Sequence, residues 1–378
     1  MVTRRALLSV CLLAIGVSLA GAKTENSAAK APPGRGPVRV FLLVGQSNMN
    51  GRGNVKVLDE KLTKDLPKKY PPSLMKIRDD VWITGANGNG ISNQMSNVRL
   101  EPGFGQFDYF GPELGFGHRM GDHYDDAVLL VKCIAGGTPL ATHWTSPSAA
   151  RRNGRQGPLK GRRAGFQGAF YKMKKALDDL PKLIEGYDPK RGYQIMGIVW
   201  VHGNADGGKY AKEYEDNLVD FITDLRMVFG LAKLPFIAVE SLSSRAPGSA
   251  FKNAADRVNK KAGDKQAGAI LSKSKINLRG DKAYSVYNAS GDGAHWKHNG
   301  RAYLDVGYWS ADLMKPMLAK TANHAADEKV QAALKKYDKL FQEGNAANKD
   351  PIYEKAQKRW GGRPPMKTAG GNNIKRKK

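Results

Sequence analysis

The sequence has 378 residues, of which 41% are hydrophobic and 8% aromatic, which excludes a disordered or low-complexity chain. Its 61 Lys and Arg outnumber its 35 Asp and Glu, so the formal net charge is +26 at pH 7. The 43 Gly and 19 Pro indicate many loops but exclude a collagen-like repeat. This length predicts one large domain with appendages, or two small domains.

The first 22 residues have the pattern of a secretory signal peptide. Arginines at positions 4 and 5 precede an apolar run over residues 6–20, and residues 20–22 (Ala-Gly-Ala) form a small-x-small cleavage site. A membrane anchor is the alternative, but the run is shorter than the ~20 residues of a spanning helix. We therefore expect cleavage, no stable membrane insertion, and a secreted or periplasmic protein.

The two cysteines limit the covalent chemistry of the chain. Cys11 lies inside the signal peptide, so the processed chain is expected to keep only Cys133 and to have no intramolecular disulfide. Export without disulfides is typical of a bacterial periplasmic or extracellular protein. One cysteine and scattered histidines do not fit a four-ligand zinc pattern, so no metal site is predicted.

Apolar runs of strand length alternate with helical patterns after a polar linker over residues 23–37. The runs cover residues 38–44, 127–133, 194–201, 234–240 and 284–287, and the helical patterns cover residues 113–124, 169–184 and 210–229. This alternation predicts βαβ units and a parallel sheet covered on both faces, with functional residues at the carboxyl ends of the strands. We place the domain at residues 38–320. A helical and basic extension, partly disordered, follows over residues 321–378, and its residues 325–341 can form an amphipathic helix.

A serine stands at the end of the first predicted strand. Ser47 belongs to the sequence Gly-Gln-Ser-Asn-Met at residues 45–49, where a crevice of the sheet should open to solvent. A serine nucleophile needs a base, and the base needs a third group that orients it. Asp292 and His295 follow the last predicted strand, so one loop can supply the orienting carboxylate and the base together. Each motif alone is common by chance.

Four blocks of sequence, in order, resemble the SGNH hydrolases, in the branch with sialate O-acetylesterase-like and acetylxylan-esterase-like domains. They are residues 41–50 (FLLVGQSNMN), 111–117 (GPELGFG), 135–140 (AGGTPL) followed by Trp144, and 292–295 (DGAH) followed by Gly300 and Arg301. The resemblance extends over residues 38–320, about three-quarters of the chain. Four ordered blocks are far more specific than any one of them.

This resemblance implies a three-layer α/β/α flavodoxin-like domain with a mostly parallel sheet. It also implies a serine carboxylester hydrolase that removes O-acetyl groups from carbohydrates through an acyl-enzyme, without a cofactor. Ser47 would be the nucleophile, His295 the base and Asp292 its partner. The Ser47 backbone N–H and that of Gly136 or Gly137 would form the oxyanion hole.

Two further residues of these blocks are candidates for contact with substrate. They are Gln46 and Trp144, and Trp144 is a packing residue if it does not wall the acyl pocket.

One block departs from the family pattern. The family has W-x-Q-G-E-x-D where this chain has Trp-Val-His-Gly-Asn-Ala-Asp at residues 200–206, so His202 replaces Gln and Asn204 replaces Glu. His202 can serve as an oxyanion donor only if its ring N–H points at the oxyanion; otherwise Asn204 donates. The alternative function is a catalytically impaired SGNH-like domain that binds glycans, in which both are turn residues.

Two segments concentrate positive charge. Residues 151–163 hold six Lys and Arg and no acid, and residues 341–378 hold ten against three acids. Neither has core periodicity, so a solvated loop and a disordered tail are expected. The first segment follows the Gly-Gly block, and the basic balance favours an anionic polysaccharide as substrate or anchor. Specific binding of nucleic acid is not expected, because the protein is predicted to be exported and has no stacking-platform motif.

Overall fold

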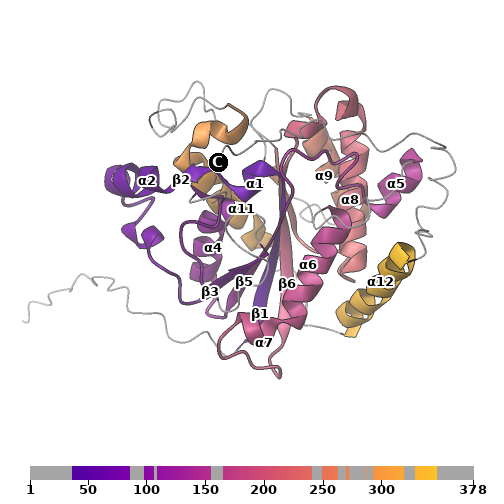
Figure 1. Cartoon of the computed structure of the whole chain (residues 1–378), viewed down its shortest axis with the longest axis horizontal. Coiled ribbons are helices and arrows are strands. Elements are labelled where there is room, and N and C mark those ends of the chain that lie inside the picture. Colours follow the sequence, from indigo (N-terminus) through magenta and orange to yellow (C-terminus); the bar gives the residue numbers. More distant parts are fainter. Residues whose placement is uncertain are drawn as a thin grey trace, which may run out of the picture. The chain divides into compact units, whose positions relative to one another are not determined.

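The computed structural model describes residues 36–85, 98–105, 109–154, 165–240, 249–262, 270–271, 286, 293–318 and 328–346. Its centre is a six-stranded sheet in the order β3-β5-β1-β6-β7-β8 (Figure 1), and every pairing in this sheet is parallel. The strands are β1 (Val38–Gly45), β3 (Val81–Thr84), β5 (Val128–Ile134), β6 (Tyr193–His202), β7 (Phe236–Glu240) and β8 (Ile270–Leu271). Within these described residues, no helix combines the length and apolar character that crossing a membrane requires.

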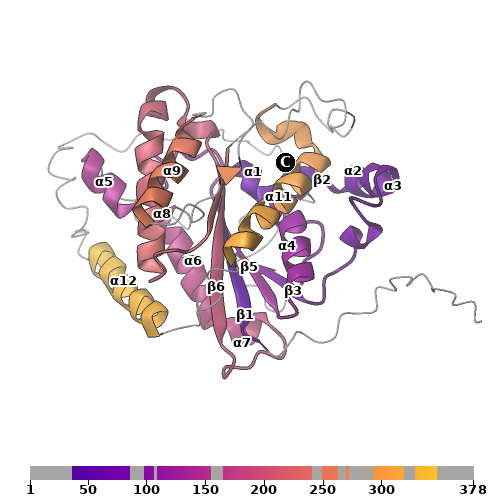
Figure 2. The same ribbon diagram turned by 180° about the vertical axis from the view of Figure 1, so that it is seen from behind.

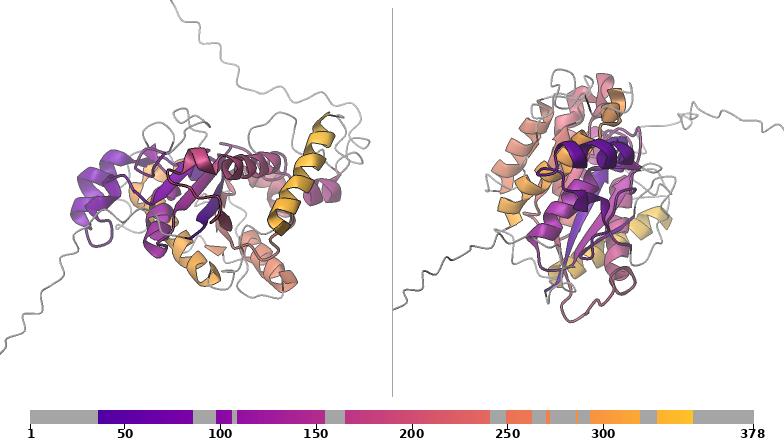
Figure 3. Two further views of the ribbon diagram at one scale, coloured as in Figure 1. Left: turned by 90° about the horizontal axis from the view of Figure 1, so that it is seen from below. Right: turned by 90° about the vertical axis from the view of Figure 1, so that its left-hand side faces the viewer.

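Helices cover both faces of the sheet (Figures 1 and 2). One face carries α4 (Pro112–His123) and α11 (Gly300–Leu318). The opposite face carries α6 (Phe166–Asp178), α8 (Tyr214–Val228) and α9 (Ala250–Ala262), and α12 (Glu328–Ala346) packs against α6 and α8. Figure 3 gives the same layers from two further directions. The predicted three-layer α/β/α fold with a parallel sheet is confirmed.

The side chains of β1 explain why this sheet is buried on both faces. Val40, Leu42 and Val44 pack with the layer that contains α6 and α8, whereas Phe41 and Leu43 pack with α4 and α11. All five are at most 1% exposed. A strand that is apolar at successive positions is stable only between two covering layers, so its sequence specifies a central position.

The strand order fixes where a site should lie. Five strands, in the order β5-β1-β6-β7-β8, follow the flavodoxin-like arrangement, and β3 extends the sheet beside β5. The chain crosses from one side of β1 to the other between β5 and β6. Parallel sheets bind ligands at such a switch point, outside the carboxyl ends of the strands. Here those ends are Gly45 of β1 and His202 of β6.

Short elements lie between β1 and β5 and were not predicted from the sequence. They are α1 (Ser47–Asn50), β2 (Gly53–Asn54), α2 (Val55–Val57), η1 (Leu58–Leu62), α3 (Thr63–Asp65), η2 (Pro72–Met75) and β4 (Tyr109–Phe110), which pairs with β2. Asp305, a fully buried residue of α11, anchors the part of this segment that lies between α3 and η2. Its carboxylate accepts from the Tyr70 hydroxyl at 2.7 Å and pairs with the Lys69 ammonium at 2.9 Å.

Three helical predictions changed in detail. The helix predicted over residues 210–229 begins at Tyr214, because residues 208–213 form the separate 3-10 helix η4 (Gly208–Glu213). The helix predicted over residues 169–184 is divided into α6 and α7 (Leu180–Leu183), because Pro181 begins a new helical turn and has no N–H to continue the old one. The predicted amphipathic helix near the C-terminus is α12, and its Val330, Leu334 and Phe341 are buried in the core. Most of the strand predicted at 284–287 lies outside the described residues.

Candidate active site

The serine turn (residues 46–51) begins where β1 ends. Gly45 has φ 152°, and a Cβ there would lie 2.2 Å from the carbonyl oxygen of Val201, so the tight exit from the strand requires glycine. Ser47 follows as the first residue of α1 and is half-buried. The turn closes when the Gly51 N–H donates to the Ser47 carbonyl at 3.0 Å. Ser47 is therefore held at the carboxyl end of the central strand.

The Gly-Gly loop (residues 135–141) runs beside this turn. The Ala135 N–H donates to the Gly45 carbonyl at 3.0 Å, which joins the loop to the end of β1. A Cβ on Gly136 would lie 4.0 Å from the Cβ of Ser47, whereas one on Gly137 would meet nothing within 4 Å. Both glycines are exposed. Of the two predicted glycine donors, Gly136 is thus the one that lies against the serine.

Hydrogen bonds from buried side chains fix the Gly-Gly loop on the side that faces the core. Asp206 is fully buried at the end of η3 (Asn204–Asp206), and its carboxylate accepts the backbone N–H groups of Leu140 and Ala141 at 2.9 and 3.1 Å. The Trp144 indole N–H donates to the Thr138 hydroxyl at 2.8 Å. The two bonds of Asp206 connect the predicted Gly-Gly block to the block that follows β6, and the bond of Trp144 lies within the Gly-Gly block.

His202 supports the same loop. The residue is fully buried, and its ring Nε2 lies 2.8 Å from the Thr138 carbonyl oxygen, so Nε2 carries the proton and donates it there. Burial is the main cause that lowers the pKa of His202 to about 3, so the ring is neutral at pH 7. A neutral imidazole has one N–H, and here that group is used within the fold. In this geometry His202 orders the loop instead of donating to an oxyanion.

Asn204 and Gln46 lie at the ends of neighbouring strands. The Gln46 side chain is 2% exposed, and its oxygen accepts the Gly203 N–H at 3.2 Å, which ties the serine turn to the end of β6. Gln46 is therefore engaged within the protein. Asn204 follows Gly203 and is half-buried, so it remains the candidate side-chain donor of this block.

Trp144 lies beneath the Gly-Gly loop. Its side chain is fully buried, with the ring edge-to-face on Trp200 at 5.1 Å and on Phe221 at 6.3 Å. This position agrees with the packing role considered for Trp144 and not with a surface that contacts substrate. The loop is therefore shaped by Trp144 from the core side.

The histidine turn (η6, Gly293–His298) brings His295 to the serine turn. His295 is half-buried, and the next three residues, Trp296, Lys297 and His298, have φ between 50° and 55°. The Tyr303 hydroxyl lies 2.9 Å from the side-chain oxygen of Asn48 and 3.2 Å from the His295 carbonyl oxygen. The two turns are thus linked through one side chain, and α1 is in contact with η6. Asp292 lies outside the described residues.

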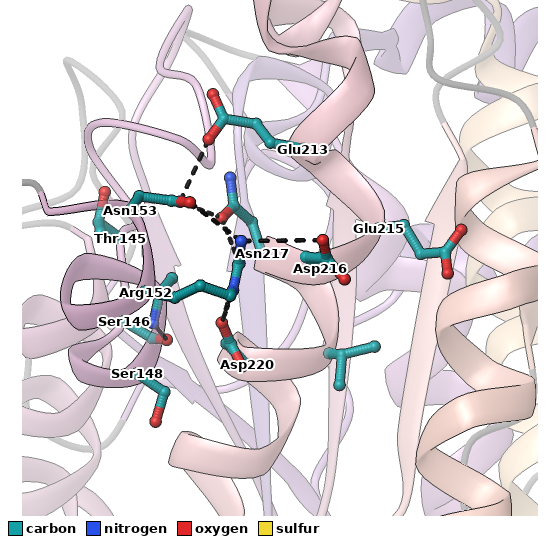
Figure 4. A network of polar contacts seen from close by, with 12 residues as sticks. Thr145, Ser146, Ser148, Arg152, Asn153, Glu213, Glu215, Asp216, Asn217 and Asp220 are labelled. Carbon is teal, nitrogen blue, oxygen red and sulfur yellow. Dashed lines mark hydrogen bonds and ion pairs between the residues drawn. The ribbon is translucent and has the colours of Figure 1, made fainter.

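The Gly-Gly loop continues into α5 (Pro147–Asn153), which is fixed to α8 by the network in Figure 4. Arg152 donates to the Asp220 carboxylate and the Asn217 side-chain oxygen, each at 2.9 Å. Asn153 donates to Asn217 at 2.9 Å and to Glu213 at 3.2 Å. The basic segment predicted as a solvated loop therefore begins as an anchored helix, and its residues 155–163 lie outside the described part.

Comparison with known proteins identifies the family. Residues 37–291 match the model of the carbohydrate esterases described as sialic acid-specific acetylesterases. The chain belongs to this family. The protein is accordingly a carboxylic ester hydrolase that acts on O-acetyl groups of carbohydrates. The match ends before His295, so the role of that residue is not covered by it.

Solved structures similar to the esterase are distant. A protein from Arabidopsis thaliana is 17% identical with a TM-score of 0.45, over 76% of this chain and 100% of that one. A carbohydrate acetylesterase from Xanthomonas citri is 14% identical with a TM-score of 0.42, over 75% of this chain and 57% of that one. No curated protein matches the sequence.

Three residues that organise the site of the esterase were not singled out from the sequence. Asp206 holds the Gly-Gly loop, Tyr303 joins the serine and histidine turns, and Lys132 of β5 lies beneath the serine turn. Asp206 belongs to the block that follows β6, so its place in that block was a usable signal. Tyr303 carries no such signal, since only tertiary structure brings it to the serine turn, whereas Lys132 stands out as a charged residue in an otherwise apolar strand. The described residues contain no cluster of three or more metal-ligating side chains.

Proposed function

We propose that this esterase removes acetyl groups from a carbohydrate through an acyl-enzyme on Ser47, with His295 as general base. The observation that carries the proposal is the position of Ser47 at the carboxyl end of β1, with Gly136 beside it. A serine at a switch point, next to an exposed glycine backbone, is the arrangement that acyl transfer requires. Asp292 is proposed to orient His295.

The reaction proceeds in two balanced steps. His295 takes the proton of the Ser47 hydroxyl while Oγ attacks the acetyl carbonyl carbon, and it then gives this proton to the departing sugar oxygen. Water repeats the sequence on the acyl-enzyme, and its attack releases acetate and restores the Ser47 hydroxyl. The negative charge on the carbonyl oxygen is held by the backbone N–H groups of Ser47 and Gly136.

Asn204 is the proposed third donor to this oxyanion. It follows Gly203, whose N–H is bonded to Gln46 directly before Ser47, so it stands next to the serine turn. The ring N–H of His202 is bonded to Thr138 and does not compete for this role. The replacement of the family's Gln by His is then compatible with catalysis, because another residue of the same block supplies the donor.

Hydrolysis of 4-methylumbelliferyl acetate by the wild type and by Ser47→Ala tests the mechanism. We expect kcat of the variant to fall to near background, since the residual rate would come only from binding and the oxyanion hole. Ser73→Ala, at an exposed serine of η2, is the matched control and should retain the wild-type rate. Equal rates in the wild type and Ser47→Ala would contradict the proposal.

The alternative function is a glycan-binding domain with impaired catalysis, and the altered block at His202 and Asn204 is the observation that favours it. Binding of an acetylated polysaccharide without release of acetate would support this alternative. Acetate release that depends on Ser47 would exclude it. Release of acetate from the polysaccharide, measured in one incubation, therefore distinguishes the two functions.

An anionic glycan is the proposed substrate class. The support is the formal net charge of +26, of which +24 remains when Arg4 and Arg5 are removed with the signal peptide, and which attracts polyanions at low ionic strength. On an acetylated anionic polysaccharide, KM should rise with added salt, while KM for 4-methylumbelliferyl acetate should stay constant. A KM on the polysaccharide that does not change with salt would argue for a neutral glycan.

The proposed location is outside the cytoplasm, in the periplasm or the medium. Its support is the signal-peptide pattern of the first 22 residues. Expression of the full chain in a bacterial host should yield a mature protein that starts after Ala22. An N-terminus that retains Arg4 and Arg5 would contradict this location.

A further inference from the structure

We propose that the buried pair of Lys132 and Glu113 is a positioning device for the serine turn, in addition to being part of the core. The inference rests on the proposed role of Ser47 as the nucleophile. It assigns a function in catalysis to two residues that make no contact with the substrate.

The ammonium group of Lys132 is completely enclosed. Its side chain has no exposed surface, and Nζ donates to the carbonyl oxygen of Asn50 at 3.0 Å, to that of Phe104 at 2.9 Å and to the Glu113 carboxylate at 2.9 Å. An ammonium has three N–H donors, so every one of them is used. The first of these bonds reaches the last residue of α1, which begins with Ser47.

Glu113 connects this ammonium to the start of α4. Its side chain is 1% exposed, and the oxygen that does not bind Lys132 accepts the Gly111 N–H at 2.7 Å. A Cβ on Gly51 would lie 2.2 Å from the Cα of Gly111, so the end of the serine turn rests directly on this helix start. The pair therefore clamps the turn to α4 and β5 at once.

The serine turn needs such an external anchor. α1 has only four residues, and a helix this short does not hold its own geometry. A displacement of the nucleophile by about 1 Å can cost about 100-fold in rate. A carbonyl held by a rigid, buried ammonium fixes the turn from the side opposite the substrate.

Stability alone is a poor explanation for the pair. A buried ion pair can often be replaced by residues of similar volume without loss of stability, because two desolvated charges are costly. Burial lowers the pKa of Lys132, and Glu113 opposes this effect, so the charge of the ammonium depends on its partner. Removal of both charges together should therefore leave the protein folded, so that any loss of activity can be assigned to the position of Ser47.

The double variant Lys132→Met/Glu113→Gln removes both charges and tests this expectation. Met keeps the length of the lysine stem, and the Gln oxygen can still accept the Gly111 N–H. The matched control is Arg226→Met, because Arg226 is also a buried cation that holds a backbone carbonyl, that of Leu234, at 2.8 and 2.9 Å. Leu234 lies just before the amino end of β7. Ser47 lies at the carboxyl end of β1, so the two residues are at opposite ends of the parallel strands.

The readouts are the thermal midpoint, kcat and KM on 4-methylumbelliferyl acetate, and the rate of labelling of Ser47 by a fluorophosphonate. We expect the double variant to remain folded with an unchanged KM, and kcat and the labelling rate to fall about 100-fold together. Arg226→Met should lower the thermal midpoint and keep the wild-type kcat. A KM-independent loss of kcat in a folded variant is the result that a purely structural pair would not give.

A folded double variant with wild-type kcat and labelling would overturn the inference while leaving the proposed function intact. If the double variant does not fold, Lys132→Gln/Glu113→Gln, which also removes both charges and keeps hydrogen-bonding groups at both positions, should fold and lose about tenfold in kcat. Failure of both to fold would also overturn the inference, since the pair would then serve the fold itself. A wild type without Ser47-dependent hydrolysis would overturn the proposed function, and the inference with it.

Discussion

The hydroxyl of Tyr303 lies 2.9 Å from the side-chain oxygen of Asn48, to which it donates a hydrogen bond. Asn48 follows the proposed nucleophile, and the same hydroxyl lies 3.2 Å from the carbonyl oxygen of His295. Tyr303 itself is fully buried in the first turns of α11, next to Trp296. One side chain of a rigid helix thus contacts both turns that the proposed mechanism must align.

Tyr303→Phe should therefore reduce activity more than the loss of one hydrogen bond suggests. The change removes the hydrogen bond that the hydroxyl donates to Asn48 of the serine turn, and such a bond contributes about 0.5–1.5 kcal/mol of unfolding free energy. We expect kcat to fall about tenfold with KM unchanged, because the proton transfer geometry changes and the substrate contacts do not. Steady-state kinetics and urea unfolding measure the two effects.

Tyr308→Phe is the control for this experiment. Tyr308 is a buried tyrosine of the same helix, but its ring stacks on Tyr70 at 6.1 Å, away from the serine turn. Its kcat should equal that of the wild type. If both variants lose the same fraction of kcat, the effect belongs to the helix as a whole and not to the contact between Tyr303 and Asn48.

Features that depend on local order along the chain could be predicted from the sequence. The continuous apolar run of β1 specifies a strand covered on both faces, and Gly45 directly after it specifies a sharp exit. These two features place Ser47 at the carboxyl end of the sheet. The proximity of Gly136 to Ser47 then follows from the pairing of β1 with β5, since both strands end at the same edge.

Features that depend on burial could not be predicted in the same way. A histidine in place of glutamine gives no indication of which ring nitrogen is bonded, and only the fold shows that the His202 N–H belongs to Thr138. Trp144 was compatible with a pocket wall or with packing until its complete burial was known. Lys132 is a charged residue in an otherwise apolar, buried strand. Its partner Glu113 comes from another element, α4, so the sequence of the strand alone does not show how the charge is paired.

Asn204→Ala tests the proposed oxyanion donor. Loss of one such donor lowers kcat by about 10²–10³-fold in a serine hydrolase, with little change in KM, because the charge exists only in the transition state. His202→Gln, which restores the residue usual in the family, should keep kcat within about tenfold of the wild type. Kinetics on 4-methylumbelliferyl acetate distinguish the two positions, and the reverse ranking would assign the donor to His202.

Lys297→Gly should stabilise the esterase. Lys297 has φ 55° at the centre of the histidine turn, and a left-handed residue with a Cβ costs roughly 1–2 kcal/mol. Glycine removes this cost but makes the unfolded chain more flexible, so we expect a net gain of about 0.5–1 kcal/mol in unfolding free energy. Lys297→Ala keeps the Cβ and should show no gain; an equal gain in both would mean that the charge, and not the backbone, was unfavourable.

The pH dependence of stability should report the buried His202. Burial lowers the pKa of this ring to about 3 in the folded protein, from the ordinary value of 6.5 that applies in the unfolded chain. The unfolded state therefore binds a proton below pH 6.5 that the folded state excludes, and stability is full above that pH and falls as the pH decreases toward 3. The contribution of one such group is up to about 1.4 kcal/mol for each pH unit.

His202→Gln removes this contribution, so the unfolding free energy of the variant should depend less steeply on pH between about 6.5 and 4.5. His118 has a pKa that burial lowers to about 4, and it remains in both proteins, so only the difference in slope is assigned to His202. His123→Gln, at an exposed position of α4, is the control and should keep most of the wild-type slope. Urea unfolding at several pH values measures these slopes, and equal slopes for the wild type and His202→Gln would show that position 202 is not protonated on unfolding.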